Sequence, residues 1–162
     1  MDSNNPKKES ILSILGKLYW LEYQMEQLLL WETMIQSGEK AKESLFTLIH
    51  DSEIHKNQLE KWFDKLNLNK PSQPPHGFPE KTFDFAGKEV PEMFSEILKY
   101  ELLAKGMYEY LMSQHEALKS LIIDDNDLTE FMSLLQNLAT AETHHSEICR
   151  ENIGSFRRIM GK

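Results

Sequence analysis

Residues 127–149, DLTEFMSLLQNLATAETHHSEIC, are the stretch of the chain that decides the fold. Apolar side chains recur in it every three or four positions, which is the spacing of one face of an α-helix. The stripe is interrupted near its middle by two ionisable residues and then resumes. Its successive members are Phe131, Leu135, Leu138, Glu142, His145 and Cys149. Because an ionisable group on the buried face of a helix is costly, the stretch predicts a packed helix with a polar site in its core.

Three other segments have the same pattern of an apolar stripe with a polar interruption near mid-helix. Together with the first stretch, they predict helices over residues 7–36, 39–66, 90–118 and 127–159. The interrupting residues are, in chain order, Glu22, Ser52 with His55, Glu101, and Glu142 with His145. No segment alternates with the period of a β-strand, so the sequence predicts an all-α protein.

The connections between these helices indicate how they are arranged. Short connections join the first helix to the second and the third to the fourth, so each pair is expected to form an antiparallel hairpin. Residues 67–89, which contain four of the six prolines, have no helical pattern. At about 3.3 Å per residue this linker spans roughly 70 Å, whereas a 28-residue helix is about 42 Å long. The linker can therefore cross the full height of an antiparallel four-helix bundle, and residues 1–162 are expected to form one domain.

Three aromatic residues of the linker, Phe78, Phe83 and Phe85, are expected to hold it against the surface of the bundle. The alternative arrangement is two hairpins joined by a flexible tether. A structureless stretch of this length is uncommon inside a compact domain unless it has a structural role, which favours the crossover.

Composition and charge exclude several classes of function. The chain has 26 acidic and 18 basic residues and a net charge of −8, so no basic face for nucleic acid is expected. No apolar run reaches the roughly 18 to 20 residues that cross a bilayer, and no apolar leader follows Met1, so we expect a cytoplasmic protein. The single cysteine, Cys149, excludes an internal disulfide and a cysteine-rich metal site.

The polar interruptions are expected to meet at one level of the bundle, because each lies close to the middle of its helix. Three carboxylates, Glu22, Glu101 and Glu142, and two imidazoles, His55 and His145, would then share one layer of the core. Burying these groups without partners is prohibitive, whereas a divalent ion such as iron, manganese or zinc takes carboxylate and imidazole ligands. The last two residues of the set are three apart and leave the same helix face. The sequence therefore predicts a metal site made of these five residues.

Other polar and aromatic residues near the stripes have simpler interpretations. His50, His115 and His144 lie off the buried stripes or too far along a helix, and they are expected outside the site. Tyr108, one heptad beyond Glu101, is expected either to fill the core or to act on the metal centre.

The order of the five residues resembles the ferritin-like superfamily, and within it the rubrerythrin-like di-iron carboxylate proteins. The family pattern is Glu, ExxH, Glu, ExxH on four helices of a bundle with one crossover, and five of its six positions match. The resemblance implies that Glu22 and Glu101 are terminal ligands. It further implies that His55 and His145 bind one metal each and that Glu142 bridges the two.

The chain departs from this pattern at Ser52, where the family has its second bridging glutamate. Each metal would still keep three protein ligands, with Glu142 shared between them. Asp51 and Glu53 flank Ser52 at about 100° to either side, and a helix rotation or a π-bulge would bring one of them inward. A di-iron site, a mononuclear site, a site with another metal preference and a degenerate site all stay open.

The resemblance implies redox chemistry in which ferrous ions react with dioxygen or peroxide. Rubrerythrins use an appended four-cysteine iron domain, which one cysteine cannot form, so the reductant would be a separate electron-donor protein. A homodimer is expected by analogy with the fold. The alternative is a non-catalytic helical module for oligomerisation or partner binding, with a decayed metal site. A third interpretation is a metal-dependent hydroxylase, which needs a pocket for an organic substrate; the sequence assigns no catalytic residue.

Overall fold

The computed structural model describes residues 6–28 and 38–160, the last six of these by their backbone only. Within these ranges every regular element is helical, which confirms the predicted all-α class. The elements are α1 (Pro6–Gln24), the 3₁₀ turn η1 (Met25–Gln27), α3 (Glu39–Lys65), α4 (Val90–Ser113), α5 (His115–Leu121) and α6 (Asp125–Met160). None of the described helices combines the length and the apolar character that crossing a membrane requires.

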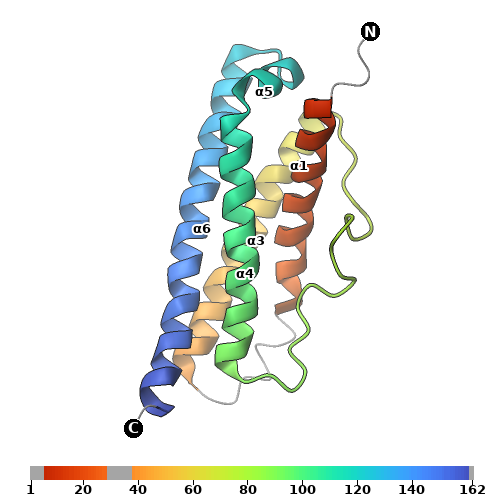
Figure 1. Cartoon of the computed structure of the whole chain (residues 1–162). Helices are drawn as coiled ribbons and strands as arrows, with labels where there is room; N and C mark the ends of the chain where they lie inside the picture. Colours follow the sequence, from red (N-terminus) through yellow and green to blue (C-terminus); the bar gives the residue numbers. More distant parts are fainter. Residues whose placement is uncertain (1–5, 29–37, 161–162) are drawn as a thin grey trace.

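The four long helices of the described ranges lie side by side along one axis (Figure 1). Contacts join them in a ring, in which α1 meets α3, α3 meets α6, α6 meets α4 and α4 meets α1. Two of them, α1 and α6, run in one direction, and α3 and α4 run in the other. The most extensive contact joins α4 and α6. Small buried side chains on both helices, Ala104 and Ala139, are consistent with a short distance between their axes.

The segment between α3 and α4 has no helix and passes along the outside of α1, from one end of the molecule to the other (Figure 1). It therefore begins α4 at the same end as α3, as expected for the crossover at 67–89. Phe83 and Phe85 are buried in the core, and Phe78 packs partly buried against it. The expectation that aromatic side chains hold this segment to the helices is confirmed.

Two of the predicted helices end elsewhere in the structure. The helix expected over 7–36 is α-helical only to Gln24, where the chain tightens into η1 because the Leu28 N–H bonds three residues back, to Met25. The rest of that expectation, residues 29–37, lies outside the described residues. The second helix, α3, matches its expected range to within one residue.

The prediction of a single helix over 90–118 is wrong in its last part. Its start at Val90 is confirmed, with a capping box between Glu89 and Glu92. Gln114 leaves the helical region at φ −99° and ψ 42°, so that α4 ends at Ser113 and α5 follows in a new direction. This break lets α5 cover the end of the molecule and bury Leu118, which outweighs the lost helical hydrogen bonds (Figure 1).

The start of the last helix is also shifted from the prediction at Asp127. Asp124 caps α6, because its carboxylate accepts the Asp127 N–H at 2.9 Å and its backbone carbonyl accepts the Leu128 N–H at 2.9 Å. The helix therefore begins at Asp125, two residues before the expected start, with the side chain of Asp124 as its cap.

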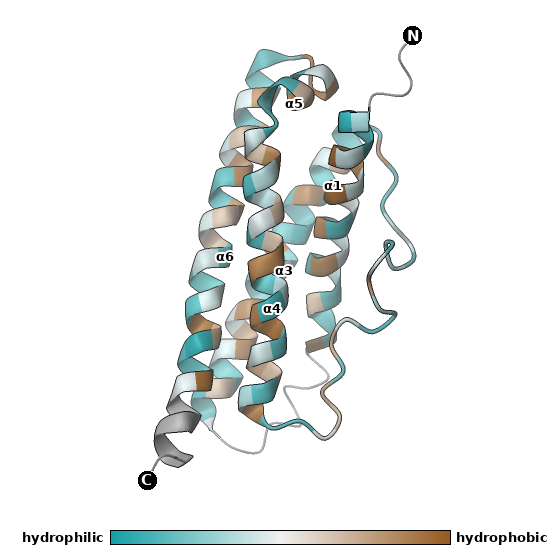
Figure 2. Cartoon of the chain, in the orientation of Figure 1, coloured by the Kyte–Doolittle hydropathy of each residue, from teal (hydrophilic) through white to brown (hydrophobic). Residues whose placement is uncertain are grey.

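Buried apolar side chains form two clusters, one on each side of a polar layer. On every long helix the chain passes from one cluster to the other at the polar interruption. In α4, for example, Ile97 belongs to one cluster, Glu101 lies in the layer, and Ala104 belongs to the other. Figure 2 shows the corresponding alternation of hydrophobic and hydrophilic residues along all four helices.

The two apolar cores should dominate the stability of the fold. Phe94 is fully buried, and we expect Phe94→Ala to lower the free energy of unfolding by about 3 to 5 kcal/mol through lost burial and a cavity. The matched control is Phe46→Ala on α3, where the ring is 59% exposed and the loss should stay within about 0.5 kcal/mol. Urea unfolding followed by circular dichroism measures both, and equal losses would contradict this assignment of the core.

Candidate metal centre

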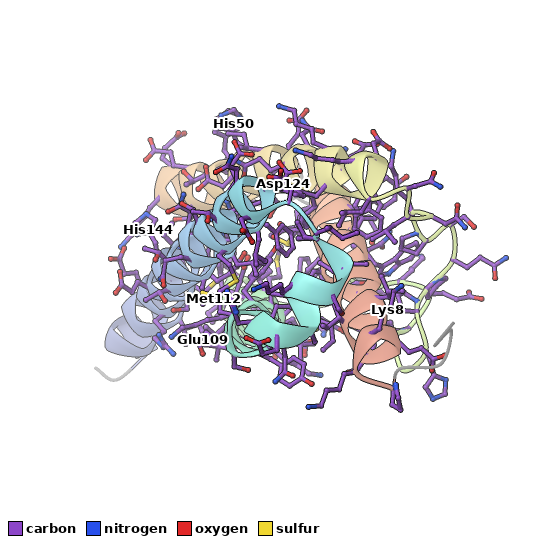
Figure 3. All side chains as sticks on the ribbon, turned by 90° about the horizontal axis from the view of Figure 1, so that it is seen from above. Lys8, His50, Glu109, Met112, Asp124 and His144 are labelled. Carbon is purple, nitrogen blue, oxygen red and sulfur yellow. The ribbon has the colours of Figure 1, made fainter. Side chains whose placement is uncertain are left out.

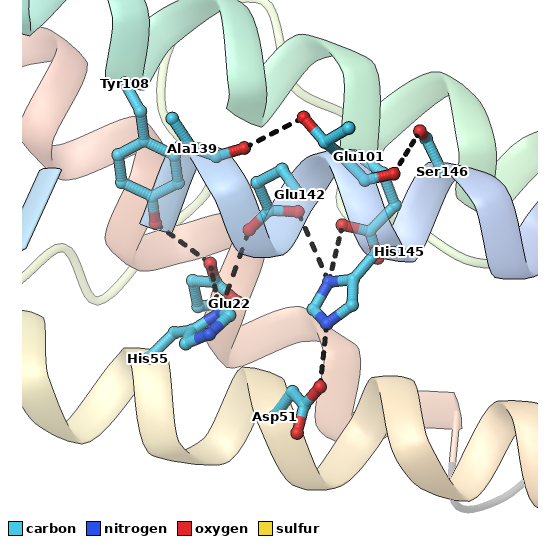
Figure 4. Close-up of polar contacts among 10 residues, drawn as sticks. Glu22, Asp51, His55, Glu101, Tyr108, Ala139, Glu142, His145 and Ser146 are labelled. Carbon is cyan, nitrogen blue, oxygen red and sulfur yellow. Dashed lines mark hydrogen bonds and ion pairs between the residues drawn. The ribbon is translucent and has the colours of Figure 1, made fainter. Parts of the chain in front are cut away.

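All five residues expected from the sequence lie together in the polar layer between the two apolar clusters (Figure 4). Each is at most 7% exposed. The helices α1, α3 and α4 contribute one of these residues each, and α6 contributes the other two from one of its faces. The donors in this layer are Glu22, His55, Glu101, Glu142 and His145.

The first group of donors joins α1, α3 and α6. The Nδ1 atom of His55 lies 3.4 Å from Oε1 of Glu22 and 3.7 Å from Oε1 of Glu142. Each residue of the group offers one ligand atom, and these atoms lie within 4.8 Å of one another. A metal ion with bonds of about 2.1 Å holds its ligands roughly 3 to 4 Å apart, so this spacing suits a single ion.

The second group joins α4 and α6. The Nδ1 atom of His145 lies 3.4 Å from Oε2 of Glu101 and 3.4 Å from Oε2 of Glu142. Its donor atoms also lie within 4.8 Å of one another. The two imidazole rings are close, with centroids 5.6 Å apart, so the two groups are neighbours.

Glu142 belongs to both groups. One of its oxygens, Oε1, faces His55, and the other, Oε2, faces His145. A carboxylate whose two oxygens address different histidines has the geometry of a ligand that bridges two ions.

The layer contains polar atoms that the protein itself leaves without hydrogen-bond partners. Among the described residues these include Nδ1 of His55, Oε1 of Glu101 and Oε2 of Glu142. Buried polar atoms normally find a partner, and these three are a nitrogen and two oxygens of the kinds that bind iron, manganese or zinc. The donor set therefore fits a metal ion.

Tyr108 fixes one of the carboxylates. Its ring is fully buried, and its hydroxyl donates a hydrogen bond of 2.9 Å to Oε1 of Glu22. The sequence left open whether this tyrosine fills the core or acts on the centre, and the structure gives it both a core position and a direct contact with a candidate ligand.

Asp51 fixes one of the histidines, a role that the sequence did not predict. Its Oδ2 atom lies 3.0 Å from Nε2 of His145, the ring nitrogen that points away from the two glutamates (Figure 4). Histidine ligands commonly donate their second ring N–H to a carboxylate, which orients the ring. α3 is a regular α-helix here, so Asp51 reaches the layer without the rotation or bulge that was considered. Ser52 is buried in the layer, and Glu53 is exposed.

The ionisation of the layer without metal follows from burial and from the neighbouring charges. Burial, and then the charges of Glu101 and Glu22, raise the pKa of Glu142 well above its ordinary value of 4.5. Burial also favours a higher pKa for Glu101. Hydrogen bonds with Glu142 and His145 outweigh this effect, so the pKa of Glu101 is lowered. Burial disfavours the charged form of His145, yet hydrogen bonds with Glu101 and Asp51 and the negative charges of Glu101 and Glu22 raise the pKa of His145 to about 9. The raised pKa values favour the neutral form of Glu142 and the charged form of His145, which makes the layer less negative, and a metal ion bound to these donors would compete with the protons.

The other histidines considered in the sequence lie away from this layer. His50 and His144 project from the outside of the helices (Figure 3), and His115 is exposed at the start of α5. The structure therefore separates them from the candidate centre, as expected.

Comparisons of the chain with models of known protein families, with curated proteins and with solved structures give no match.

The raised pKa of His145 predicts how the metal-free fold depends on pH. Because this pKa is higher in the folded chain than its ordinary value of 6.5, protonated His145 stabilises the fold below pH 6.5, and the contribution is lost as the pH rises toward 9. In chelator-treated protein, the free energy of unfolding should fall over this window, at about 1.4 kcal/mol for each unit of pKa shift.

Denaturant unfolding at a series of pH values measures this fall. His145→Gln should make the fall between pH 6.5 and 9 shallower, although the raised pKa of Glu142 contributes a fall of the same sign that this variant keeps. His144→Gln, which changes the exposed neighbour of the same helix, is the control and should leave the profile as it is. A wild-type profile that is flat or rising across the window would contradict the assigned charge of His145.

Proposed function

We propose that the chain is a ferritin-like four-helix-bundle protein that binds two metal ions, iron first among them, in the layer between its helices. The observation that carries the proposal is the position of Glu142, whose two oxygens face His55 and His145. Two groups of three donors share this one carboxylate. A pair of ions bridged by Glu142 accounts for all five buried donors at once.

The arrangement of the helices supports the same proposal. Four long helices of the described ranges contact one another in a ring, and an outer crossover starts α4 at the same end as α3. This topology, with one long crossover, is the one that ferritin-like bundles use to bring Glu and ExxH residues together.

Different residues of the layer would bind each of the two ions. Glu22 and His55 would bind one ion, Glu101 and His145 the other, with Glu142 between them. Bound iron would supply one-electron redox chemistry toward dioxygen or peroxide.

Residues around the layer would keep the ligands in place. The hydroxyl of Tyr108 holds Glu22 through the bond of 2.9 Å, and Asp51 orients His145 through its second ring nitrogen. Both contacts are of the kind that orients metal ligands from outside the coordination sphere. Manganese or zinc fits the same donors as iron.

The electrons that return the metals to the reduced state would come from a separate donor protein. Cys149 is the single cysteine and is buried, so the chain cannot build a cysteine-ligated iron site of its own. We further propose a homodimer as the assembled form, by analogy with other proteins of this architecture.

The second candidate function is a non-catalytic helical module with a decayed metal site, acting in oligomerisation or partner binding. Ser52 is the observation that favours it, because this buried position in the layer has a hydroxyl where a carboxylate would bridge. The two candidates differ in whether the chain is stabilised by metal.

Removing the bridging charge distinguishes the two candidates. We expect Glu142→Gln, which preserves the side-chain shape, to leave metal-free stability unchanged or raised, since a buried ionisable group is lost. At a metal concentration of 100 times Kd the wild-type chain should gain about 2.7 kcal/mol, and the variant should lose most of that gain. Elemental analysis after reconstitution with ferrous ion should give two ions per chain for the wild type and fewer than one for the variant.

The control for this experiment is Glu147→Gln, which changes an exposed glutamate of the same helix and should behave as wild type. A wild-type chain that retains no iron, manganese or zinc after reconstitution would refute the proposal and leave the non-catalytic module.

The position of Ser52 gives an independent test. Ser52→Glu would add the second bridging carboxylate, so we expect it to tighten binding of the second ion. Without metal the same change adds a buried charge, and the free energy of unfolding should fall by several kcal/mol. Isothermal titration with cobalt(II) and denaturant unfolding measure these opposite effects. Asn57→Glu, on the exposed face of the same helix, should produce neither.

A further inference from the structure

A small cavity lies against the carboxylates of the candidate centre. Its volume is about 10 Å³, and its lining includes Glu22, Glu101 and Glu142 together with Met25, Tyr100 and Phe83. These residues come from α1, η1, α4, α6 and the crossover. The cavity therefore lies on the side of the carboxylates that faces α1 and α4.

Its size limits what can occupy it. A volume of about 10 Å³ accommodates roughly one water molecule. Pockets for organic ligands usually measure about 300 to 1,000 Å³. The cavity thus suits an ion or a molecule of very few atoms, which disfavours the hydroxylase interpretation of the sequence.

The carboxylates that line the cavity still have binding capacity. Oε1 of Glu101 and Oε2 of Glu142 are buried and have no hydrogen-bond partner within the described protein. A small cationic or hydrogen-bonding ligand that entered the cavity would meet these oxygens.

Phe83 lines the cavity from the side of the crossover. The ring is 2% exposed and packs edge-on against Tyr100, with centroids 5.3 Å apart, and against Phe85 at 5.9 Å. The segment that carries it has no helix, so its displacement would break no helical hydrogen bonds. Segments of this kind open locally at lower free energy than packed helices do.

We propose that Phe83 is the gate of the metal centre, and that it admits only ions and molecules of very few atoms to the carboxylates. The proposal rests on the proposed function, because it assigns the route to that same site. Opening requires only the crossover around Phe83 to move away from Tyr100, with the four long helices in place. The gate would let ions reach a layer whose five donors are each at most 7% exposed.

Cobalt(II) is a suitable probe because its visible absorbance reports the ligands around it. Stopped-flow mixing gives its binding rate, and mixing the loaded protein with a chelator gives its release rate. We expect Phe83→Ala to accelerate both by about tenfold or more, equivalent to about 1.4 kcal/mol in the barrier. The equilibrium affinity should be nearly unchanged, since no ligand is altered.

Phe78→Ala is the control, since Phe78 lies in the same segment, packs partly buried against the other apolar cluster and is not part of the cavity lining. It should leave both rates near wild type. Equal acceleration in the two variants would show general loosening of the crossover, and no acceleration by Phe83→Ala would place the route elsewhere; either result overturns the proposal. If Phe83→Ala does not fold, Phe83→Leu should give a smaller acceleration in the same direction.

Size selection is tested on the cobalt-loaded protein. Fluoride should change the cobalt spectrum of both the wild type and Phe83→Ala, whereas benzoate should change only that of the variant. A change with benzoate in the wild type would refute the size limit. A wild-type chain that binds no cobalt, manganese, zinc or iron would instead refute the proposed function, and with it the gate.

Discussion

The burial of three carboxylates and two imidazoles in one layer is the constraint on which the rest of the structure depends. Removing such groups from water is very unfavourable unless each charge finds a partner. Within the described protein the partners are internal: Tyr108 donates to Glu22, Asp51 contacts His145, and burial with the neighbouring charges raises the pKa of Glu142, which favours its neutral form. Three buried polar atoms of the layer, Nδ1 of His55, Oε1 of Glu101 and Oε2 of Glu142, still have no hydrogen-bond partner among the described residues.

The layer also sets the register of the helices. Each long helix passes from one apolar cluster to the other at its polar residue, so a shift of one turn, about 5.4 Å, would press a charge against an apolar core. The crossover is needed to place the helices in this register. Since α3 and α4 run in the same direction, only a segment that returns along the whole height brings Glu101 to the level of His55. The same segment therefore covers the carboxylates and connects the two hairpins.

The sequence predicted the helical class, the crossover and the meeting of five ionisable side chains in one layer, because all three follow from periodicity and from residue types at mid-helix. It failed where tertiary packing decides. No proline or glycine marks the break at Gln114 in the sequence. The break arises from the burial of Leu118 over the end of the core. Asp51 was considered as a substitute ligand. Its contact with Nε2 of His145 depends on how α3 and α6 approach each other, and the spacing of residues along one helix cannot predict that approach.

The contact of Asp51 also bears on the missing carboxylate at Ser52. Two divalent ions carry four positive charges, and Glu22, Glu101 and Glu142 offer three negative ones. Asp51 brings a fourth carboxylate into contact with the layer, through His145 at 3.0 Å and from a position that is 34% exposed. The chain would thereby keep the charge balance of a four-carboxylate centre while burying one charge fewer.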